Sequence, residues 1–176
     1  FNGAVKKFLN SSCWAVTKIL DYIDIAHSDG AICVLGGKPY TGAGAQGLQF
    51  VEPTIFTNVS NDMRIAQEEV FGPILAVIPF DTEEEAIEIG NDIVFGLAAG
   101  GWTSDIGRAL RMADKLKVGT MWVNTYRAVS FTSPCGGYKR SGQGRESGQQ
   151  AIKEFLQVKS VWIAQQTTAA NPFIMR

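Results

Sequence analysis

The spacing of apolar residues predicts an alternation of helices and strands along the chain. Apolar side chains recur at intervals of three and four over residues 13–25, which predicts a helix that ends near His27. Two short runs rich in β-branched residues, 31–35 and 54–59, predict strands, and the stretch 38–47 between them predicts a loop. A helix followed by two strands is therefore expected in the first third of the chain.

The clearest pattern is a pair of strand–helix–strand units in the middle of the chain. The apolar run 74–80 predicts a strand, after which Asp81 and Thr82 can cap a helix, with Glu84 or Glu85 supplying the reciprocal carboxylate. A second strand is predicted at 97–103, a second helix that starts at Ser104 and Asp105, and a third strand at 120–124. Two successive units imply a parallel sheet, so the predicted fold class is α/β. The residues expected to face inward are Ala86 and Ile89 in the first helix, and Ile106, Ala109, Leu110, Ala113 and Leu116 in the second.

The regular pattern ends at Asn124. An irregular stretch with five glycines at 136–148 follows, and long loops inside compact domains are usually functional. A short helix is predicted at 149–155 and a final strand at 157–163. The polar residues 164–176 predict a loose tail.

Charge and hydropathy narrow the functional class. The 176 residues include 16 basic and 17 acidic side chains, for a formal net charge of -1, with no block of like charge. This balance gives no electrostatic attraction to nucleic acid or to an anionic membrane. The longest uncharged apolar stretches, 70–80 and 93–104, are shorter than the roughly 20 residues that cross a bilayer. We therefore expect neither nucleic acid nor a membrane as a partner.

The cysteines and the first residue bear on compartment and completeness. Cys13, Cys33 and Cys135 have no C-x-x-C spacing, which argues against a disulfide framework and against a zinc site. They predict a reducing compartment, and the cytoplasm is the expected location. The chain opens on Phe1 with no signal-peptide pattern, so this end is expected to be a cut end.

A pair of carboxylates enters the strand predicted at 74–80. In an extended chain, Glu69 and Phe71 would lie on one face. A carboxylate can accept hydrogen bonds from two vicinal sugar hydroxyls, and a ring beside it can support a flat heterocycle. The pair could therefore grip the ribose and base of a nucleotide. The alternative is that Glu68 and Glu69 are solvated charges and that Phe71 belongs to the core.

Five segments carry a resemblance to a known family: QEEVFGPILAVIPF, GLAAGGWTSD, GTMWVN, SPCGGYKRSGQGRESG and VKSVWI, in that order. They resemble the C-terminal part of the NAD(P)-dependent aldehyde dehydrogenase superfamily, over roughly residues 16–163. The resemblance implies that 1–176 is a single domain, a C-terminal fragment of the catalytic and oligomerisation region, with 164–176 as its tail. It also implies that the strand at 157–163 pairs with another subunit, so a homo-oligomer is expected.

The resemblance implies roles for four residues. Glu69 corresponds to the family glutamate that binds the nicotinamide-side ribose, and Phe71 to the aromatic near the nicotinamide. Asn124 corresponds to the floor of the substrate region; the alternative is a polar strand end that satisfies backbone groups. Glu146 corresponds to a glutamate that helps relay protons; the alternative is a carboxylate stabilised by the dipole of the following helix.

The loop at 125–134 resembles the wall of the family's substrate tunnel. Val129 and Cys135 stand where many members carry aromatic rings, so an aromatic box for flat or long aldehydes is not expected here. The residues that would set selectivity instead are Tyr126, Arg127 and Phe131.

The catalytic residues of the family are not expected in this chain. The family mechanism uses a cysteine thiolate that attacks the aldehyde and a glutamate that activates water against the thioester, both farther upstream. Cys13 is only 56 residues before Glu69 and lacks the glycine-rich turn around a nucleophile. A hydrolase pairing Cys135 with His27 would require the two to meet across the fold.

Two functions follow from these observations. In the first, the chain is the C-terminal part of an enzyme that oxidises an aldehyde to a carboxylic acid with NAD or NADP, and is inactive in isolation. In the second, it is a naturally truncated, non-catalytic relative that acts as an oligomerisation or binding module. The sequence identifies neither the aldehyde nor the choice between NAD and NADP, because residues that read the adenosine ribose belong to the dinucleotide-binding domain.

Overall fold

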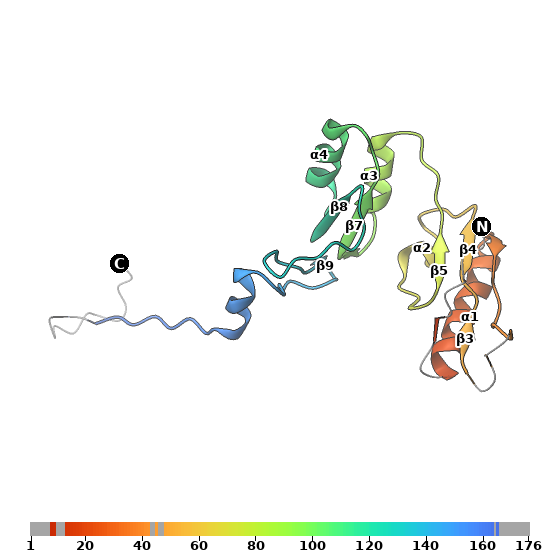
Figure 1. The fold of residues 1–176 in the computed structure, drawn as a ribbon, viewed down its shortest axis with the longest axis horizontal. Helices are drawn as coiled ribbons and strands as arrows, with labels where there is room; N and C mark the ends of the chain where they lie inside the picture. The colour runs from red at the N-terminus through yellow and green to blue at the C-terminus, as the bar shows by residue number, and fades with distance from the viewer. Residues whose placement is uncertain (1–7, 10–12, 43–44, 46–47, 164, 166–176) are drawn as a thin grey trace, which may run out of the picture.

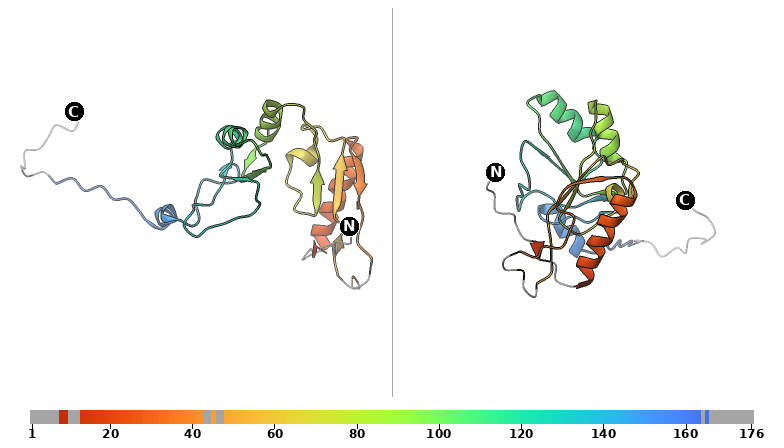
Figure 2. Two further views of the ribbon diagram at one scale, coloured as in Figure 1. Left: turned by 45° about the horizontal axis from the view of Figure 1, so that its top comes forward. Right: turned by 90° about the vertical axis from the view of Figure 1, so that its right-hand side faces the viewer.

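The computed structural model describes residues 8–9, 13–42, 45, 48–163 and 165. They form two lobes, followed by an extended segment that runs away from both (Figure 1). The first lobe comprises the described residues up to 80, and the second lobe comprises 81–148. The left view of Figure 2 also shows the two lobes side by side. The fold is mixed α/β.

The first lobe packs one long helix on a small sheet. Helix α1 (Cys13–Ser28) ends where the apolar periodicity predicts, and it covers strands β2 (Ile32–Leu35), β4 (Thr54–Thr57) and β5 (Ile74–Ala76). The strand order is β2-β4-β5, with β2 antiparallel and β5 parallel to β4. The lobe also holds a pair of two-residue strands, β1 (Phe8–Leu9) with β3 (Phe50–Val51), and the short helix α2 (Arg64–Gln67).

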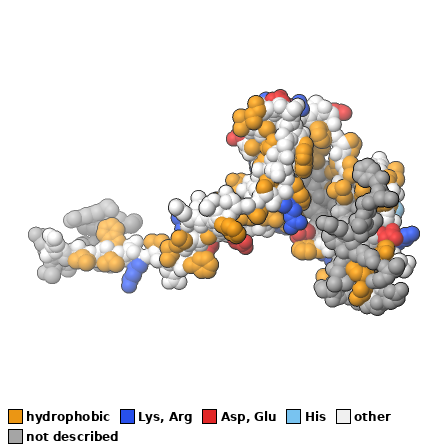
Figure 3. Space-filling model, viewed as in Figure 1, with side chains coloured by type: hydrophobic (Ala, Val, Ile, Leu, Met, Phe, Trp, Pro, Cys, Tyr) orange, Lys and Arg blue, Asp and Glu red, His pale blue; other side chains and the backbone are white. Residues whose placement is uncertain are grey.

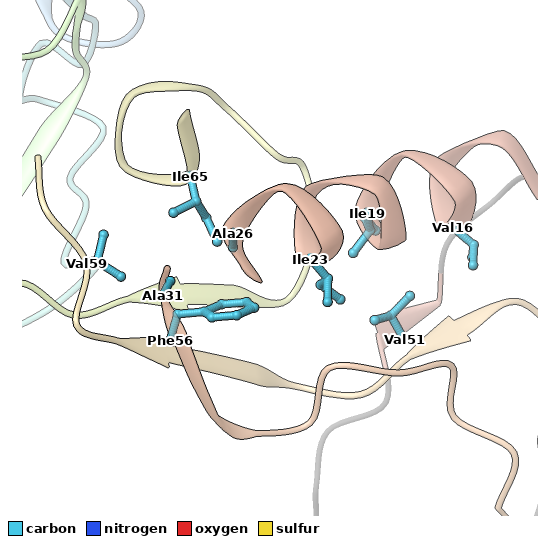
Figure 4. Close-up of a cluster of buried hydrophobic side chains, with 9 residues drawn as sticks. All are labelled: Val16, Ile19, Ile23, Ala26, Ala31, Val51, Phe56, Val59 and Ile65. Atoms are coloured by element: carbon cyan, nitrogen blue, oxygen red, sulfur yellow. The ribbon is translucent and has the colours of Figure 1, made fainter. Parts of the chain in front are cut away.

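A single apolar cluster stabilises the first lobe. Helix α1 contributes one face of its surface, and the strands and α2 close the cluster from the other side (Figure 4). Its buried members are Val16, Ile19, Ile23, Ala26, Ala31, Val51, Phe56, Val59 and Ile65. The three-and-four spacing in α1 therefore marks its buried face correctly.

The second lobe consists of two helices and short strands. In chain order these are α3 (Glu83–Asn91), β6 (Phe95–Gly96), β7 (Ala98–Gly101), α4 (Ile106–Lys115), β8 (Thr120–Val123) and β9 (Tyr138–Lys139). Strands β7 and β8 are parallel, and β6 pairs with β9. Both predicted caps form: the Thr82 hydroxyl accepts from the Glu85 N–H at 3.1 Å, and the Asp105 carboxylate accepts from the N–H groups of Gly107 and Arg108.

Two details of the predicted sheet differ from the structure. Strands β5 and β7 belong to different sheets, so the first of the two expected strand–helix–strand units does not close into a parallel pair. Strand β5 ends at Ala76; the Val77 N–H still donates to the Phe56 carbonyl of β4 at 2.9 Å, and residues 78–80 then lead to α3 outside any strand. The apolar run 74–80 indicates a segment that can be buried, but it does not show which strand will lie beside that segment in the sheet.

The predicted inward face of α4 is also wrong in part. Ala109 is buried, but Ile106 and Leu110 are 74% and 65% exposed. The side of α4 that meets the lobe carries Ala109, Met112 and Leu116. The apolar stripe on this helix is wide, and periodicity alone does not say which part of it meets the sheet.

The strand predicted at 157–163 does not form. After the 3₁₀ helix η1 (Gln149–Phe155), the chain runs on without strand pairing, and Val158 and Trp162 are 98% and 94% exposed. Hydrophobic side chains are visible on the surface along this segment (Figure 3). A strand needs a second strand for its ladder of hydrogen bonds, and no described residue of this chain offers one. The predicted tail at 164–176 lies outside the described residues, except for Gln165.

Candidate active site

The segment that carries Glu69 and Phe71 turns sharply as it leaves α2. Glu68 is extended, but Phe71 has a φ of 58°, in the left-handed region. We predicted that Glu69 and Phe71 would lie on one face of an extended strand. That prediction is wrong, because the chain leaves the extended conformation at Phe71. A Cβ at Gly72 would lie 2.6 Å from Ile19 Cγ1, so glycine is required where the segment crosses α1.

Glu68 is fully engaged by its neighbours. Arg64 donates from Nε and Nη2 to the two carboxylate oxygens, each at 2.9 Å, and the Tyr22 hydroxyl donates to Oε2 at 2.6 Å. The hydrogen bonds from Arg64 lower the pKa of Glu68 to about 2. The hydrogen bond to Glu68 raises the pKa of Tyr22 above its ordinary value. The carboxylate is thus held as an anion between α1 and α2.

Glu69, the next residue, has a free carboxylate. Its side chain is exposed, and no described residue forms a hydrogen bond or ion pair with it. Its backbone carbonyl accepts from Lys18 Nζ at 3.2 Å, and the same ammonium lies 5.7 Å from the Phe71 ring centroid. Phe71 is 75% exposed, so its alternative placement in the core is wrong. A solvent-facing acid and ring lie two residues apart.

These two glutamates border an open hollow. It has a volume of about 510 Å³ and is lined by Glu68 and Glu69 on one side and by residues around β6 on the other. The remaining lining residues are Ile93, Phe95, Leu97, Arg140 and Ser141. The Glu69 carboxylate offers this hollow an acceptor of hydrogen bonds, and the exposed Phe71 ring lies two residues further along the chain, outside the lining. An acceptor, a flat ring and open space are what the polyol and heterocycle of a nucleotide require, so the residues present fit such a group.

Asn124 ties the ends of two strands together. It has a φ of 53°, and its Oδ1 accepts from the Thr103 N–H while its Nδ2 donates to the Thr103 carbonyl, both at 2.8 Å. Its own N–H donates to the Gly101 carbonyl at 2.9 Å. The alternative of a polar strand end that satisfies backbone groups therefore describes what this side chain does in the structure.

The predicted tunnel loop lies beyond Asn124. Trp122 Nε1 donates to the Ala128 carbonyl at 2.8 Å, and the Trp122 ring packs edge-on against Tyr126 at 5.7 Å. Val129 and Phe131 are almost wholly exposed. The loop is therefore anchored at its beginning, while its apolar tip faces solvent.

The structure brings Cys135 and Glu146 together. Each N–H donates to the other's carbonyl at 2.7 Å, which makes a two-bond bridge across the glycine-rich loop. Both residues border a hollow of about 620 Å³ that also includes Arg145, Glu154 and Phe155. Sequence reasoning missed this pairing, because the ten residues between Cys135 and Glu146 carry no periodicity that would reveal a bridge.

Other candidate groups are not assembled into a site. His27 packs edge-on against Phe56 in the first lobe at 5.4 Å, whereas Cys135 pairs through its backbone with Glu146 in the second lobe. Helix α1 begins at Cys13, whose side chain is outside the description. The described residues contain no cluster of three or more metal-ligating side chains. Within those residues, no helix has the length and apolar character that would carry it across a membrane.

Comparison with known proteins identifies relatives that match most of this chain. The aldehyde dehydrogenase family model matches residues 11–161. A betaine aldehyde dehydrogenase of Mesorhizobium japonicum is 45% identical over 146 residues, which cover 83% of this chain and 30% of the relative.

Two solved structures extend the comparison. The indole-3-acetaldehyde dehydrogenase AldA of P. syringae, in complex with NAD+ and IAA, is 45% identical with a TM-score of 0.83, covering 88% of this chain and 31% of that one. The betaine aldehyde dehydrogenase betB of Staphylococcus aureus, in complex with NAD+, is 44% identical with a TM-score of 0.79, covering 82% and 28%.

The chain thus spans about a third of the length of the relatives that it matches. Within that third, the family match includes both lobes and the segments that carry Glu69, Asn124 and Glu146. The chain belongs to the aldehyde dehydrogenase family.

Proposed function

We propose that this chain forms the C-terminal part of an NAD(P)-dependent aldehyde dehydrogenase, which oxidises an aldehyde to a carboxylic acid through a cysteine thioester. The nucleophilic cysteine and the dinucleotide-binding domain would lie in polypeptide outside this chain, and 1–176 would be one part of the catalytic domain. The aldehyde dehydrogenases that it matches, each about three times its length, support this proposal. The free cysteines Cys33 and Cys135 support a reducing compartment such as the cytoplasm.

The difference between Glu68 and Glu69 is the observation that carries the proposal. The carboxylate of Glu68 accepts hydrogen bonds from Arg64 and Tyr22, whereas the adjacent carboxylate of Glu69 is exposed and unpaired among the described residues. Two oxygens of one carboxylate can accept from both hydroxyls of a nicotinamide ribose, and the exposed Phe71 ring can flank the nicotinamide. When bound, NAD or NADP supplies the hydride acceptor for the oxidation. Glu69 and Phe71 would bind and orient it.

The second lobe would supply the substrate side. We assign Glu146 to proton relay, where its backbone bridge to Cys135 fixes its place beside the loop. Asn124 would act by holding the β8 end at the floor of the substrate region through Thr103. Val129 and Cys135 would line the tunnel, and Cys135→Phe in the intact enzyme is then expected to change the order of preference among aldehydes of different size. An unchanged order would remove Cys135 from the tunnel.

The direct test is Glu69→Gln in the intact enzyme. The amide keeps the shape but accepts fewer and weaker hydrogen bonds than the carboxylate, so the dissociation constant of NAD+ should rise about tenfold or more. Glu88→Gln, an exposed acid on α3, is the matched control and should change nothing. Isothermal titration with NAD+ measures both. Equal affinity in the Glu69 variant and the control would exclude Glu69 from the site.

A second candidate, an oligomerisation module without catalysis, is favoured by the segment after η1. Val158, Trp162 and Ile163 are strongly exposed apolar side chains on a chain that has no strand partner. A second copy could offer that partner, which would also apply to the intact enzyme as a homo-oligomer. Size-exclusion chromatography with light scattering at micromolar concentration tests this. A monomer at all concentrations would rule out the module.

A further inference from the structure

One turn of α1 contacts the whole segment that presents the cofactor residues. Tyr22 donates its hydroxyl hydrogen to Glu68, Lys18 donates to the backbone carbonyl of Glu69, and Ile19 packs where Gly72 crosses the helix. Positions 18, 19 and 22 lie side by side on a helix. The segment is therefore fixed at its beginning, middle and end by one rigid element.

Arg64 closes this arrangement from the other side. It binds both oxygens of Glu68, and its guanidinium lies 5.6 Å from the centroid of the Tyr22 ring. Because Arg64 begins α2 and Tyr22 belongs to α1, Glu68 is the point at which the two helices are joined. A carboxylate held by a planar two-point donor and a third hydroxyl has little freedom to rotate.

We infer that Tyr22 is a positioning residue for cofactor binding: together with Arg64 it fixes Glu68, and thereby sets the backbone turn that presents Glu69 to the open hollow and leaves the Phe71 ring exposed. Tyr22 does not touch the cofactor in this arrangement. It acts through Glu68, the residue immediately before the one that binds. This inference rests on the proposed role of Glu69.

Stability alone does not account for the network. The side chains of Arg64 and Glu68 are 53% and 40% exposed, and ion pairs so open to water contribute little to the free energy of unfolding. The buried cluster beneath α1 already holds the helix to the sheet. What the network adds is orientation of residues 69–71, whose own N–H groups form no backbone hydrogen bond with any described residue. A turn without such bonds depends on its flanking contacts.

The protonation states support this role. Arg64 keeps the pKa of Glu68 near 2, so this carboxylate is an acceptor throughout the neutral range. The pKa of Tyr22 is raised, chiefly by its hydrogen bond to Glu68, so the hydroxyl remains a donor there. The Tyr22–Glu68 hydrogen bond is thus available wherever the enzyme would work.

The test is Tyr22→Phe, which removes one hydroxyl and keeps the ring beside Arg64. The matched control is Tyr138→Phe, because the Tyr138 ring also lies 5.6 Å from a guanidinium, that of Arg145, but its hydroxyl bonds to no described residue. Two measurements are made. Backbone ¹⁵N order parameters of residues 69–72 are measured in this chain, and the dissociation constant of NAD+ is measured by calorimetry in the intact enzyme without aldehyde.

We expect Tyr22→Phe to lower the order parameters at 69–72 from about 0.85 toward 0.6, values typical of rigid and flexible backbone. We expect about a tenfold weaker affinity for NAD+, because binding would then have to order the turn that Tyr22 no longer fixes through Glu68. The melting temperature and the Tyr138 control should stay unchanged. Order parameters that do not move would overturn the inference.

Comparing Tyr22→Phe with Glu69→Gln distinguishes a failure of the positioning role from a failure of the proposed cofactor site. If Glu69→Gln weakens NAD+ binding and Tyr22→Phe does not, the positioning role is wrong and the cofactor site stands. If neither weakens it, both are wrong. Should Tyr22→Phe fail to fold, Arg64→Gln replaces it, because that side chain is half exposed at the first residue of α2. It should give the same loosening at 69–72, and an unchanged turn would again refute the network.

Discussion

The two lobes bury their apolar side chains to different degrees. The first lobe has a continuous cluster of nine buried residues, among them Phe56 and Ile19 at 0% exposure. In the described part of the second lobe, Ile87 and Ala109 are the buried hydrophobic residues. A largely apolar hollow of about 790 Å³ remains open there between α3, β7 and α4. The first lobe can therefore hold its geometry by itself, whereas the second needs more apolar contact to do so.

This difference separates the two halves of the proposed site. Glu69 and Phe71 extend from the first lobe, where α1 and the cluster beneath it fix their backbone. Asn124 and Cys135 belong to the second lobe, where hydrogen bonds of the Asn124 amide to Thr103 and the backbone bridge between Cys135 and Glu146 hold the loops together over an incomplete core. We therefore expect the cofactor side to keep its arrangement in the isolated chain better than the substrate side does.

Phe56→Ala should produce the largest effect, because it removes the centre of the only continuous cluster among the described residues. Loss of a fully buried phenyl ring lowers the free energy of unfolding by about 3–5 kcal/mol. Urea unfolding followed by circular dichroism measures it. A loss below about 1 kcal/mol would mean that the first lobe is not the stable one, and the contrast between the lobes would be lost.

Local patterns predicted most of the first lobe and the caps of the second. Helix α1 and the capping residues Thr82 and Asp105 depend on contacts within a few positions, so composition and spacing suffice to find them. The family of the chain was also predictable, because its motifs stand in order along the sequence. The strand predicted at 157–163 is absent from the structure. The sequence shows that this segment favours a strand, but a strand forms only beside a second strand, and the described chain does not contain one there.

The sequence could not predict that the Glu68 carboxylate would be bound by neighbouring side chains while the Glu69 carboxylate would be exposed. Both are acids at the entrance to the same strand, and what distinguishes them is Tyr22, 46 positions away, with Arg64. The bridge between Cys135 and Glu146 is hidden for the same reason. Asn124 left two interpretations open, and its partner Thr103 decides how its amide is used. Long-range contacts, rather than residue types, assign these roles.

A smaller, pH-dependent effect should come from Glu83, which joins α3 to α4. Its carboxylate accepts from Arg111 at 2.7 Å and 2.8 Å and from Arg108 at 3.2 Å, and the hydrogen bonds from Arg111 lower its pKa from 4.5 to about 2. Because the pKa is lower in the folded state, the stabilisation is complete above pH 4.5 and is lost as the pH falls toward 2.

Glu83→Gln should therefore lower the melting temperature at pH 7, and the difference from the unaltered chain should shrink as the pH falls below 4.5 and through about 2. Glu84→Gln on the same turn of α3, exposed and in no salt bridge with a described residue, is the control. Melting curves at several pH values give the result. A difference that is the same at pH 7 and pH 2 would show that the two arginines do not hold this carboxylate.

The smallest effect is expected from Ile106→Lys on the outer face of α4. This side chain is 74% exposed, and surface substitutions away from special features change the free energy of unfolding by less than about 0.5 kcal/mol. Ala109→Lys, three positions on, places the same charge in a buried position and should destabilise the chain strongly. Paired urea titrations of these variants decide which face of α4 packs inward. If Ile106→Lys costs as much as Ala109→Lys, the apolar stripe is covered after all, and the second lobe is better packed than its open hollow indicates.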